Sequence, residues 1–355
     1  MTIDTLWYTR CPAPTAASVA LREGWMEQEF APEGIAVRSL ASARERSVHQ
    51  SHYTHSQPNS FRFGGYVPPL VSASRGADLR VLGLSWPDRT AAVLALPRSG
   101  LHSASALRGK RLSVPRRMRD DIDWWRALVL SGYESALASA GLTFQDVHLV
   151  EVNIDRRYVE DATTGHTTGQ SLWGARSQFA VQREEVAALL RGEVDAIYSD
   201  AAMGEIVKAV LGLTVVVDLT RHEETGDVAT GQPLVLTATG SLVESRPDLV
   251  SRWLARLLEA NAWARAHHSR TLQIIAQDTG LPEDFVPAAY SPRVHEQLDL
   301  SLSPLRCRLL QTKCDELARR GFLEKPLSID TLIDPGPLER AQALHGEKVQ
   351  HAAQA

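Results

Sequence analysis

Short apolar runs alternate with amphipathic segments along most of the chain. The runs are rich in β-branched and aromatic residues and have the length of buried strands. They lie at 5–9, 78–86, 91–96, 110–114, 147–152, 194–199, 214–219 and 233–239. Because helical patterns separate them, the sequence predicts an α/β protein with mostly parallel sheets.

Three intervening segments carry the pattern of helices. Residues 181–191 are followed by a glycine, the residue type that most often ends a helix. Residues 246–266 and 304–320 place apolar side chains at helical spacing, so that one face of each packs inward. Cys307 and Cys314 stand seven residues apart on one face of the last helix, and we interpret them as small packing residues.

Two other stretches lack a clear period. Residues 153–179 are rich in Thr, Gly, Asp and Arg, and we interpret them as a long loop or lid. The tail after Gly336 is polar and rich in alanine, and we expect it to be partly frayed. The sequence contains neither a GxGxxG fingerprint nor a P-loop motif, so nothing in it indicates a dinucleotide or nucleoside triphosphate.

The chain has 355 residues, more than one hydrophobic core usually holds, and we therefore expect two lobes. Apolar residues make up 44% and charged residues 23%, which is typical of a soluble enzyme or binding protein and argues against long disorder. The net charge of −4 gives no reason to expect nucleic acid or an anionic membrane as a partner. No apolar run approaches the roughly 20 residues of a membrane span.

The first residues, MTIDTLWYTR, lack the basic start and apolar segment of an export signal, so we expect a cytoplasmic protein. Cys11, Cys307 and Cys314 form no metal-ligand spacing. In a reducing compartment they are expected to remain thiols, and no metal is predicted.

Cys11 stands between a predicted strand and a predicted helix. If residues 5–9 are a strand and 15–22 a helix, the cysteine lies at the carboxyl edge of a sheet, where ligands bind in open α/β folds. The helix N-terminus there favours anions and would help to hold the sulfur as thiolate. Pro12 and Pro14 stiffen the turn. The alternative, a cysteine buried as a small hydrophobe, is left open by this segment alone.

A second stretch, HYTHSQPNSFRFGGYVPPL, implies another place for an anion. Gly64 and Gly65 permit a turn with exposed backbone N–H groups before a helix that begins with two prolines. Arg62 carries a planar donor fork that suits two oxygens of one acid group, although an isolated arginine is more often a solvated surface residue. His52 and His55 could polarise a thiol or merely satisfy a loop.

Together, DTLWYTRCPAP and the pattern His–X–Thr–X–X–Gln–Pro–X–X–X–Arg–Phe–Gly–Gly–X–X–Pro–Pro–Leu resemble the 2'-hydroxybiphenyl-2-sulfinate desulfinase family of dibenzothiophene-desulfurising bacteria. Looser similarity at 191–205, 215–219 and 241–267 extends the resemblance over most of the chain.

The resemblance implies a two-lobed type II periplasmic-binding-protein-like fold with a cleft between the lobes. Each lobe is expected to be a mixed, mostly parallel sheet flanked by helices. Residues 1–96 and 218–355 would form lobe I, which carries the active site, and residues 97–217 would form lobe II.

The resemblance also implies a site made of a cysteine, a histidine, an arginine and a glycine amide. By motif position these fall on Cys11, His52, Arg62 and Gly65. Gln57, in the Gln–Pro pair, and Gly64 are expected to contact the substrate as well. His55 stands at a position that the motif does not fix.

The activity implied is cleavage of the C–S bond of an aromatic sulfinate to sulfite and a phenolic product, without a metal or organic cofactor. Arg62 and the Gly65 amide would hold the sulfinate oxygens. Cys11 would either attack sulfur as thiolate or protonate the ipso carbon, and the sequence leaves both routes open. His52 would bind the thiol or order the water. The aromatic residues that could stack on the substrate, or equally lie in the core, are Trp7, Tyr53, Phe61 and Phe63.

A non-catalytic solute-binding protein for an organic sulfonate or similar anion is the alternative, because the same fold serves transporters. Such a receptor needs an export signal and needs no cysteine at its binding edge, so an enzyme is favoured. A pyrimidine-precursor synthase of this fold would need a cysteine-rich iron motif, which the sequence lacks. The expected partner is a small aromatic sulfinate, bound by a monomer.

Overall fold

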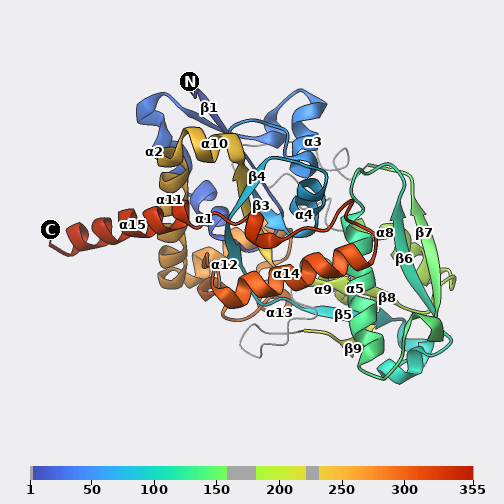
Figure 1. Ribbon diagram of the computed structural model, residues 1–355. Coiled ribbons are helices and arrows are strands. Elements are labelled where there is room, and N and C mark those ends of the chain that lie inside the picture. Colours follow the sequence, from blue (N-terminus) through green and yellow to red (C-terminus); the bar gives the residue numbers. More distant parts are fainter. Residues whose placement is uncertain (1–2, 158–180, 221–231, 355) are drawn as a thin grey trace.

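The computed structural model describes residues 3–157, 181–220 and 232–354 (Figure 1). Within these ranges the strands are β1 (Thr5–Arg10), β2 (Ala36–Ser39), β3 (Ser60–Gly65), β4 (Leu79–Ser85), β5 (Ala91–Ala95), β6 (Arg111–Arg117), β7 (His148–Ile154), β8 (Ile197–Asp200), β9 (Thr214–Asp218) and β10 (Leu234–Thr239).

The α-helices in the same ranges are α1 (Ala16–Arg22), α2 (Trp25–Phe30), α3 (Arg46–Thr54), α4 (Val67–Ser74), α5 (Trp124–Ala138), α8 (Arg183–Leu190), α9 (Ala201–Leu211), α10 (Gly240–Ser245), α11 (Pro247–Ala266), α12 (His268–Thr279), α13 (Val286–Ala289), α14 (Pro304–Arg319) and α15 (Gly336–Gln354). None of these helices is both long and apolar enough to cross a membrane.

The first sheet has the strand order β2-β1-β3-β10-β4. Strand β1 runs parallel to β2 and β3, whereas β10 runs antiparallel to β3 and β4. Helices α1, α2 and α11 group on this sheet (Figure 1), and its apolar side chains share one core with them. In that core the ring of Phe61 stacks on Trp253 of α11, with ring centroids 4.3 Å apart.

The second part of the molecule contains two smaller sheets. Strands β8, β5 and β9 form an antiparallel sheet in that order, and β6 and β7 form a parallel pair. A bridge between Leu112 and Ala196 joins the pair to the segment that leads into β8. Helices α5, α8 and α9 lie around these strands (Figure 1).

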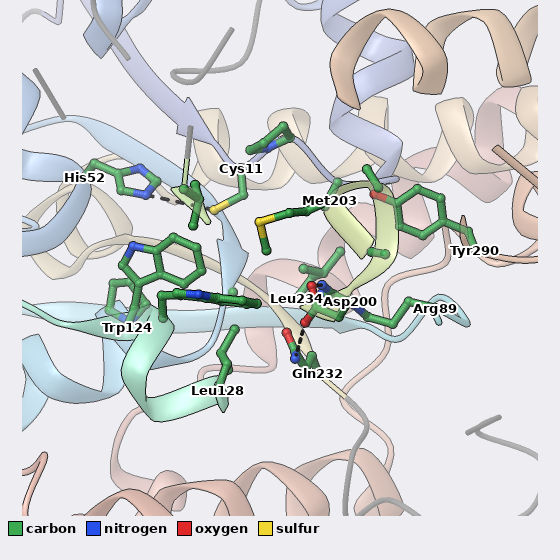
Figure 2. A pocket seen from close by; sticks show the side chains of 18 of the residues that line it. Cys11, His52, Arg89, Trp124, Leu128, Asp200, Met203, Gln232, Leu234 and Tyr290 are labelled. Atoms are coloured by element: carbon green, nitrogen blue, oxygen red, sulfur yellow. Dashed lines mark hydrogen bonds and ion pairs between the residues drawn. The ribbon is translucent and has the colours of Figure 1, made fainter. Parts of the chain in front are cut away.

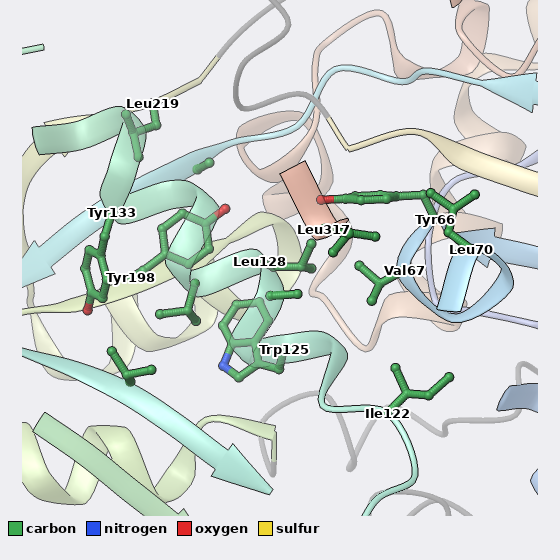
Figure 3. Packing of buried hydrophobic residues seen from close by; sticks show 14 of the residues in the cluster. Tyr66, Val67, Leu70, Ile122, Trp125, Leu128, Tyr133, Tyr198, Leu219 and Leu317 are labelled. Atoms are coloured by element: carbon green, nitrogen blue, oxygen red, sulfur yellow. The ribbon is translucent and has the colours of Figure 1, made fainter. Parts of the chain in front are cut away.

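A large apolar cluster connects the two parts of the molecule. Figure 3 shows Val67 and Leu70 of α4 near Trp125 and Leu128 of α5, with Leu317 of α14 between them. Burial of this much apolar surface favours a fixed arrangement of the helices. Trp125 and Leu128 belong to this cluster and also line the cavity described below, so the packing positions one cavity wall.

The predicted elements are largely confirmed. Each predicted apolar run contains or overlaps a strand, and residues 181–191, 246–266 and 304–320 correspond to α8, α11 and α14. Polar caps begin several helices: Thr15 accepts a hydrogen bond from the backbone of α1, and Ser303 does the same for α14. The predicted lid at 153–179 lies almost entirely outside the described residues.

Three expectations are wrong. Parallel pairing does not dominate the sheets. Among the described strands it is limited to the pairs β1–β2, β1–β3 and β6–β7. The reason is that β5 and β10, which link the two parts of the chain, run antiparallel to their neighbours. The tail after Gly336 forms α15, which buries Leu338 and Ala341 against α11. Gly64 and Gly65 end strand β3 instead of forming a turn.

The proposed lobe boundaries, 1–96 with 218–355 and 97–217, stay a prediction. The strand pairings place β5 (Ala91–Ala95) in the sheet of β8 and β9, so by pairing alone this strand goes with the second lobe.

Candidate functional site

A cavity, partly open to solvent, lies between the first sheet and helices α5 and α9. Cys11 and His52 lie on one side of it (Figure 2), and Arg62 and Gly65 line it as well. Residues from α5, from the start of α9 and from the segment before β10 line the rest.

The turn between β1 and α1 places Cys11 at the carboxyl edge of the first sheet, as predicted. The backbone N–H of Cys11 donates to the carbonyl of Phe63 at 3.0 Å, which extends the pairing of β1 with β3 by one residue. The first turn of α1 follows at once and is capped by Thr15. The side chain of Cys11 is half-buried and faces the cavity.

A buried ion cluster holds the base of this turn. Arg10, immediately before Cys11, pairs with Asp278 of α12, and Arg22 of α1 donates to the same carboxylate at 2.9 Å. Because Asp278 is fully buried, removing either of its partners would leave a charge with poor compensation. The cluster therefore fixes the turn to α1 and α12.

The absence of a side chain at Gly64 makes room for Cys11. A Cβ at this position would overlap the Sγ of Cys11 and lie 3.0 Å from its Cβ. A Cβ at the neighbouring Gly65 would meet nothing within 4 Å. Gly64 has no positive φ, so the reason for glycine here is the close approach of the cysteine and not a turn.

The thiol lies within reach of both predicted partners. The Sγ of Cys11 is 3.9 Å from the Nε2 of His52 and 3.9 Å from the Nη2 of Arg62. Residues far apart in sequence are thus brought together at one sulfur atom. Their chemical roles stay predictions.

Thr9 orients His52, and sequence reasoning missed it. The Oγ1 of Thr9 lies 2.9 Å from the Nδ1 of His52, which leaves Nε2 directed at the thiol. Thr9 lies in β1 two residues before Cys11, and the backbone of Cys11 continues the pairing with β3, so the strand period of two places both side chains on the same side of the sheet. That period of two was the available signal.

Both histidines are neutral at physiological pH. Burial, together with the charge of Arg62, lowers the pKa of His52 well below its ordinary value. Burial and the same arginine lower the pKa of His55 to about 3. A neutral imidazole can donate or accept one hydrogen bond at Nε2 without adding a charge beside the thiol.

Arg62 supplies the fixed positive charge of this side. Its side chain is only 2% exposed, and burial lowers its pKa from the ordinary value while the neighbouring Cys11 opposes that shift. Its Nε donates to the carbonyl of His52 and its Nη1 to the carbonyl of Gly65, each at 3.0 Å. These two bonds hold the guanidinium plane, and Nη2 is directed at the sulfur.

Other predicted site residues lie elsewhere. Gln57 and Gly64 are not among the described residues that line the cavity; the backbone of Gln57 is tied to Ser51 instead. His55 ends α3 in a left-handed conformation, and its Nδ1–H donates to the carbonyl of Tyr53 at 3.1 Å. It therefore contributes to the turn, and His52 is the histidine at the thiol.

The aromatic lining differs from the expected one. The described residues that line the cavity do not include the expected aromatic residues Trp7, Tyr53, Phe61 and Phe63. Of these four, the last three are buried. Trp124 and Trp125 at the start of α5, and Tyr290 after α13, line it instead. The consecutive tryptophans after the helix cap Asp123 were visible in the sequence, but nothing local showed that α5 turns toward Cys11.

Polar groups that the sequence did not assign stand on the opposite wall. Asp200, at the end of β8, forms an ion pair of 2.8 Å with Arg89 and accepts a hydrogen bond of 2.7 Å from Gln232. All three residues line the cavity. Asp200 is within the segment 191–205 that carried part of the family resemblance.

The two other cysteines are packing residues, as interpreted. The thiols of Cys307 and Cys314 contact backbone carbonyls of Leu302 and Leu327, each at 3.5 Å. Burial raises the pKa of both thiols, that of Cys314 to about 11. Among the described residues, no group of three or more His, Cys, Asp or Glu side chains could hold a metal ion.

The depressed histidine pKa values predict that acid destabilises the fold. The unfolded chain binds protons on both histidines below about pH 6.5, and the folded chain does not, so stability is present above that pH and lost below it. From pH 6.5 to 5.5 the free energy of unfolding should fall by roughly 1 kcal/mol per histidine. Urea unfolding at both pH values measures this. The His52→Asn/His55→Asn double variant should show a shallower pH dependence, and an unchanged one would contradict the assignment.

The contact at Gly64 predicts a strong difference between two adjacent glycines. Gly64→Ala should displace the thiol of Cys11 and lower the free energy of unfolding by about 1–3 kcal/mol, the usual cost of overpacking. Gly65→Ala, the matched control, should change stability by less than about 0.5 kcal/mol. Denaturant unfolding and the rate of Cys11 labelling by a thiol reagent measure both effects. Equal behaviour of the two variants would exclude the packing role of Gly64.

No protein-family model matches the chain. The curated 2'-hydroxybiphenyl-2-sulfinate desulfinase of Rhodococcus erythropolis is 28% identical, and the match covers 96% of this chain and 94% of that protein. A crystal structure of a cysteine-to-serine mutant of the desulfurization enzyme DszB with biphenyl-2-sulfinic acid is 25% identical, with a TM-score of 0.78 over 97% of this chain and 100% of that one.

The aliphatic sulphonate binding protein SsuA of Escherichia coli shares the fold, with a TM-score of 0.65 and 17% identity over 94% of this chain and 93% of that one. The predicted periplasmic-binding-protein-like fold is thereby confirmed. With sequence similarity and a shared fold over nearly all of its length, this chain is a homologue of the 2'-hydroxybiphenyl-2-sulfinate desulfinases.

Proposed function

We propose that the protein is a desulfinase, a hydrolase that cleaves the C–S bond of an aromatic sulfinate and releases sulfite. The observation that carries the proposal is the position of one thiol, 3.9 Å from both an imidazole and a guanidinium, at the wall of a cavity. Its homologues bear the name of this activity, and a solved relative was crystallised with biphenyl-2-sulfinic acid.

The overall reaction is the addition of water across a C–S bond. The aryl carbon loses its bond to sulfur and gains a proton, while sulfur gains the oxygen of water and leaves as bisulfite. No electrons are exchanged with another molecule. The protein has to hold a small anion, supply a proton to carbon and direct an oxygen to sulfur.

Arg62 is the proposed anchor for the sulfinate. A guanidinium stabilises the two negative oxygens by charge-assisted hydrogen bonds, and a site shielded from water strengthens them. The side chain is held by the carbonyls of His52 and Gly65, so it needs little reorganisation when the anion binds. The backbone amide of Gly65, at the cavity wall, is the second proposed donor.

Cys11 is the proposed reacting group. In one route its thiolate attacks sulfur, the ipso carbon takes a proton as the aryl group leaves, and water then releases bisulfite from the thiosulfonate-like intermediate and restores the thiol. In the other route the thiol gives its proton to the ipso carbon, and water captures the sulfur dioxide that departs. The position of Arg62 beside the sulfur supports either, because it favours negative charge there.

His52 and Thr9 are proposed to position the thiol. A neutral His52 holds the thiol or the water by one ring nitrogen, while Thr9 fixes the other. The lobe division, the monomeric state and the cytoplasmic location stay predictions. They do not enter the proposed chemistry.

Cys11→Ser should reduce sulfite release by at least about 10²–10⁴-fold while preserving the fold, because the hydroxyl is both a poorer nucleophile and a weaker acid. The assay measures sulfite from 2'-hydroxybiphenyl-2-sulfinate and from a benzothiophene-derived sulfinate. Cys307→Ser, which replaces a packing thiol outside the cavity, is the matched control and should retain activity. Tight binding of the sulfinates with no sulfite formed would favour a solute-binding protein instead.

Thr9→Val should lower kcat/KM about tenfold, the effect of about one lost hydrogen bond, because His52 loses the partner of its Nδ1. Thr9→Ser should recover most of the activity. In the His52→Gln background Thr9→Val should cost little more, because both changes remove the same arrangement. Additive losses would show that Thr9 acts independently of His52.

A further inference from the structure

We infer that the cavity wall opposite Cys11 is a subsite for a neutral hydroxyl group carried by the part of the substrate remote from the sulfinate. The subsite consists of Arg89, Asp200, Gln232 and Tyr290. This inference rests on the proposed function and specifies which substituent of the substrate the protein recognises.

The subsite is a built polar cluster. Asp200 has one oxygen 2.8 Å from the Nη2 of Arg89, and its other oxygen accepts from Gln232 at 2.7 Å and from the hydroxyl of Tyr198 at 3.3 Å. The side chain of Asp200 is 5% exposed. The carboxylate is therefore held rigidly, with its charge facing a cavity that Arg89 and Gln232 also line.

Hydrogen-bonding capacity remains unused in this cluster. The Nε of Arg89 is buried and has no hydrogen-bond partner among the described residues. The carboxylate of Asp200 accepts from Arg89, Gln232 and Tyr198, and because a carboxylate has about four acceptor positions, one is left for a donor on the ligand. A polar substituent on the ligand is the natural partner for the groups on this wall.

The charges of the cluster select a neutral substituent. Arg89 and Asp200 cancel, so a second acid group would meet the carboxylate, and an amine would meet the guanidinium. Tyr290 adds a donor to the cluster. Burial raises the pKa of Tyr290 and keeps its phenol protonated, and because its oxygen accepts from the backbone N–H of Ala202, its O–H can donate to the ligand. A hydroxyl group can both donate to Asp200 and accept from Tyr290 or Arg89.

An apolar stretch separates this cluster from the thiol. Figure 2 shows Cys11 and His52 on one side of the cavity and Asp200 and Gln232 on the other, with Trp124, Leu128 and Met203 along the walls. The cavity therefore offers an anion site, an apolar middle and a neutral polar end. That order of features matches a two-ring sulfinate with a hydroxyl on its second ring, such as the compound named in the homologues.

The test compares kcat/KM for 2'-hydroxybiphenyl-2-sulfinate, biphenyl-2-sulfinate and 2'-carboxybiphenyl-2-sulfinate. The wild-type protein should prefer the hydroxylated compound over the unsubstituted one by about tenfold, and the carboxylated one should be the poorest. Asp200→Asn leaves the charge of Arg89 uncompensated, so the carboxylated compound should improve at least about tenfold relative to the unsubstituted one.

A second variant removes the polar groups altogether. Arg89→Met/Asp200→Leu replaces the ion pair with apolar side chains of similar volume, a change that buried pairs often tolerate. The preference for the hydroxyl over the unsubstituted sulfinate should then disappear, and circular dichroism with the thermal unfolding midpoint reports correct folding. Glu205→Gln is the matched control. Glu205 pairs with Lys208, which also lies on α9, and it is not among the described residues that line the cavity. It should leave all three ratios unchanged.

Three outcomes would overturn the subsite: no preference for the hydroxyl in the wild-type protein, an unchanged preference in both variants, or the equal binding described next. Calorimetry with the Cys11→Ser variant measures the Kd of each sulfinate separately from turnover. Equal Kd values for the hydroxylated and unsubstituted compounds exclude the subsite. Absence of sulfite from every compound, with a preserved difference in Kd, excludes the proposed desulfinase and leaves the subsite in place.

Discussion

The parallel pairing of β1 with β3 is the constraint on which the rest of the site depends. It sets Thr9 opposite Arg62 and continues into the hydrogen bond between Cys11 and Phe63. A glycine at position 64 is required for that approach, because any side chain there would occupy the space of the thiol. One strand pair therefore positions Thr9, Arg62 and Cys11. His52 is positioned by its hydrogen bond to Thr9 and by Arg62, which binds its carbonyl.

Burial decides how charge is distributed in the cavity. Arg62 stays charged, and it helps to keep both neighbouring histidines neutral. The side of the cavity at Cys11 thus carries one positive charge held by backbone carbonyls, which suits one small anion. The opposite wall carries a balanced pair, Arg89 with Asp200. A ligand with a single charged end and an apolar body fits this asymmetry better than a diacid or a zwitterion.

The same fold serves sulfonate-binding proteins, so the architecture alone does not separate an enzyme from a receptor. Both kinds of protein need a cleft that holds a sulfur oxyanion. What distinguishes this chain is a half-buried thiol within reach of a neutral imidazole, which a receptor does not need. The apolar cluster that joins α4, α5 and α14 matters for the same reason, because it keeps the wall that carries Trp125 and Leu128 in place around the thiol.

Local sequence determined the strands, the main helices, and the position of Cys11 between a strand and a helix, because period and capping residues act over a few neighbours. The tertiary structure decided what lies around that cysteine. Sheet order turned β5 and β10 antiparallel, the core took up Phe61 and Phe63, and α5 brought Trp124 and Trp125 to the cavity in their place. Asp200 and Gln232 meet only after the chain has crossed between the sheets. Contacts between segments this far apart depend on how whole sheets and helices pack, and no local pattern encodes that.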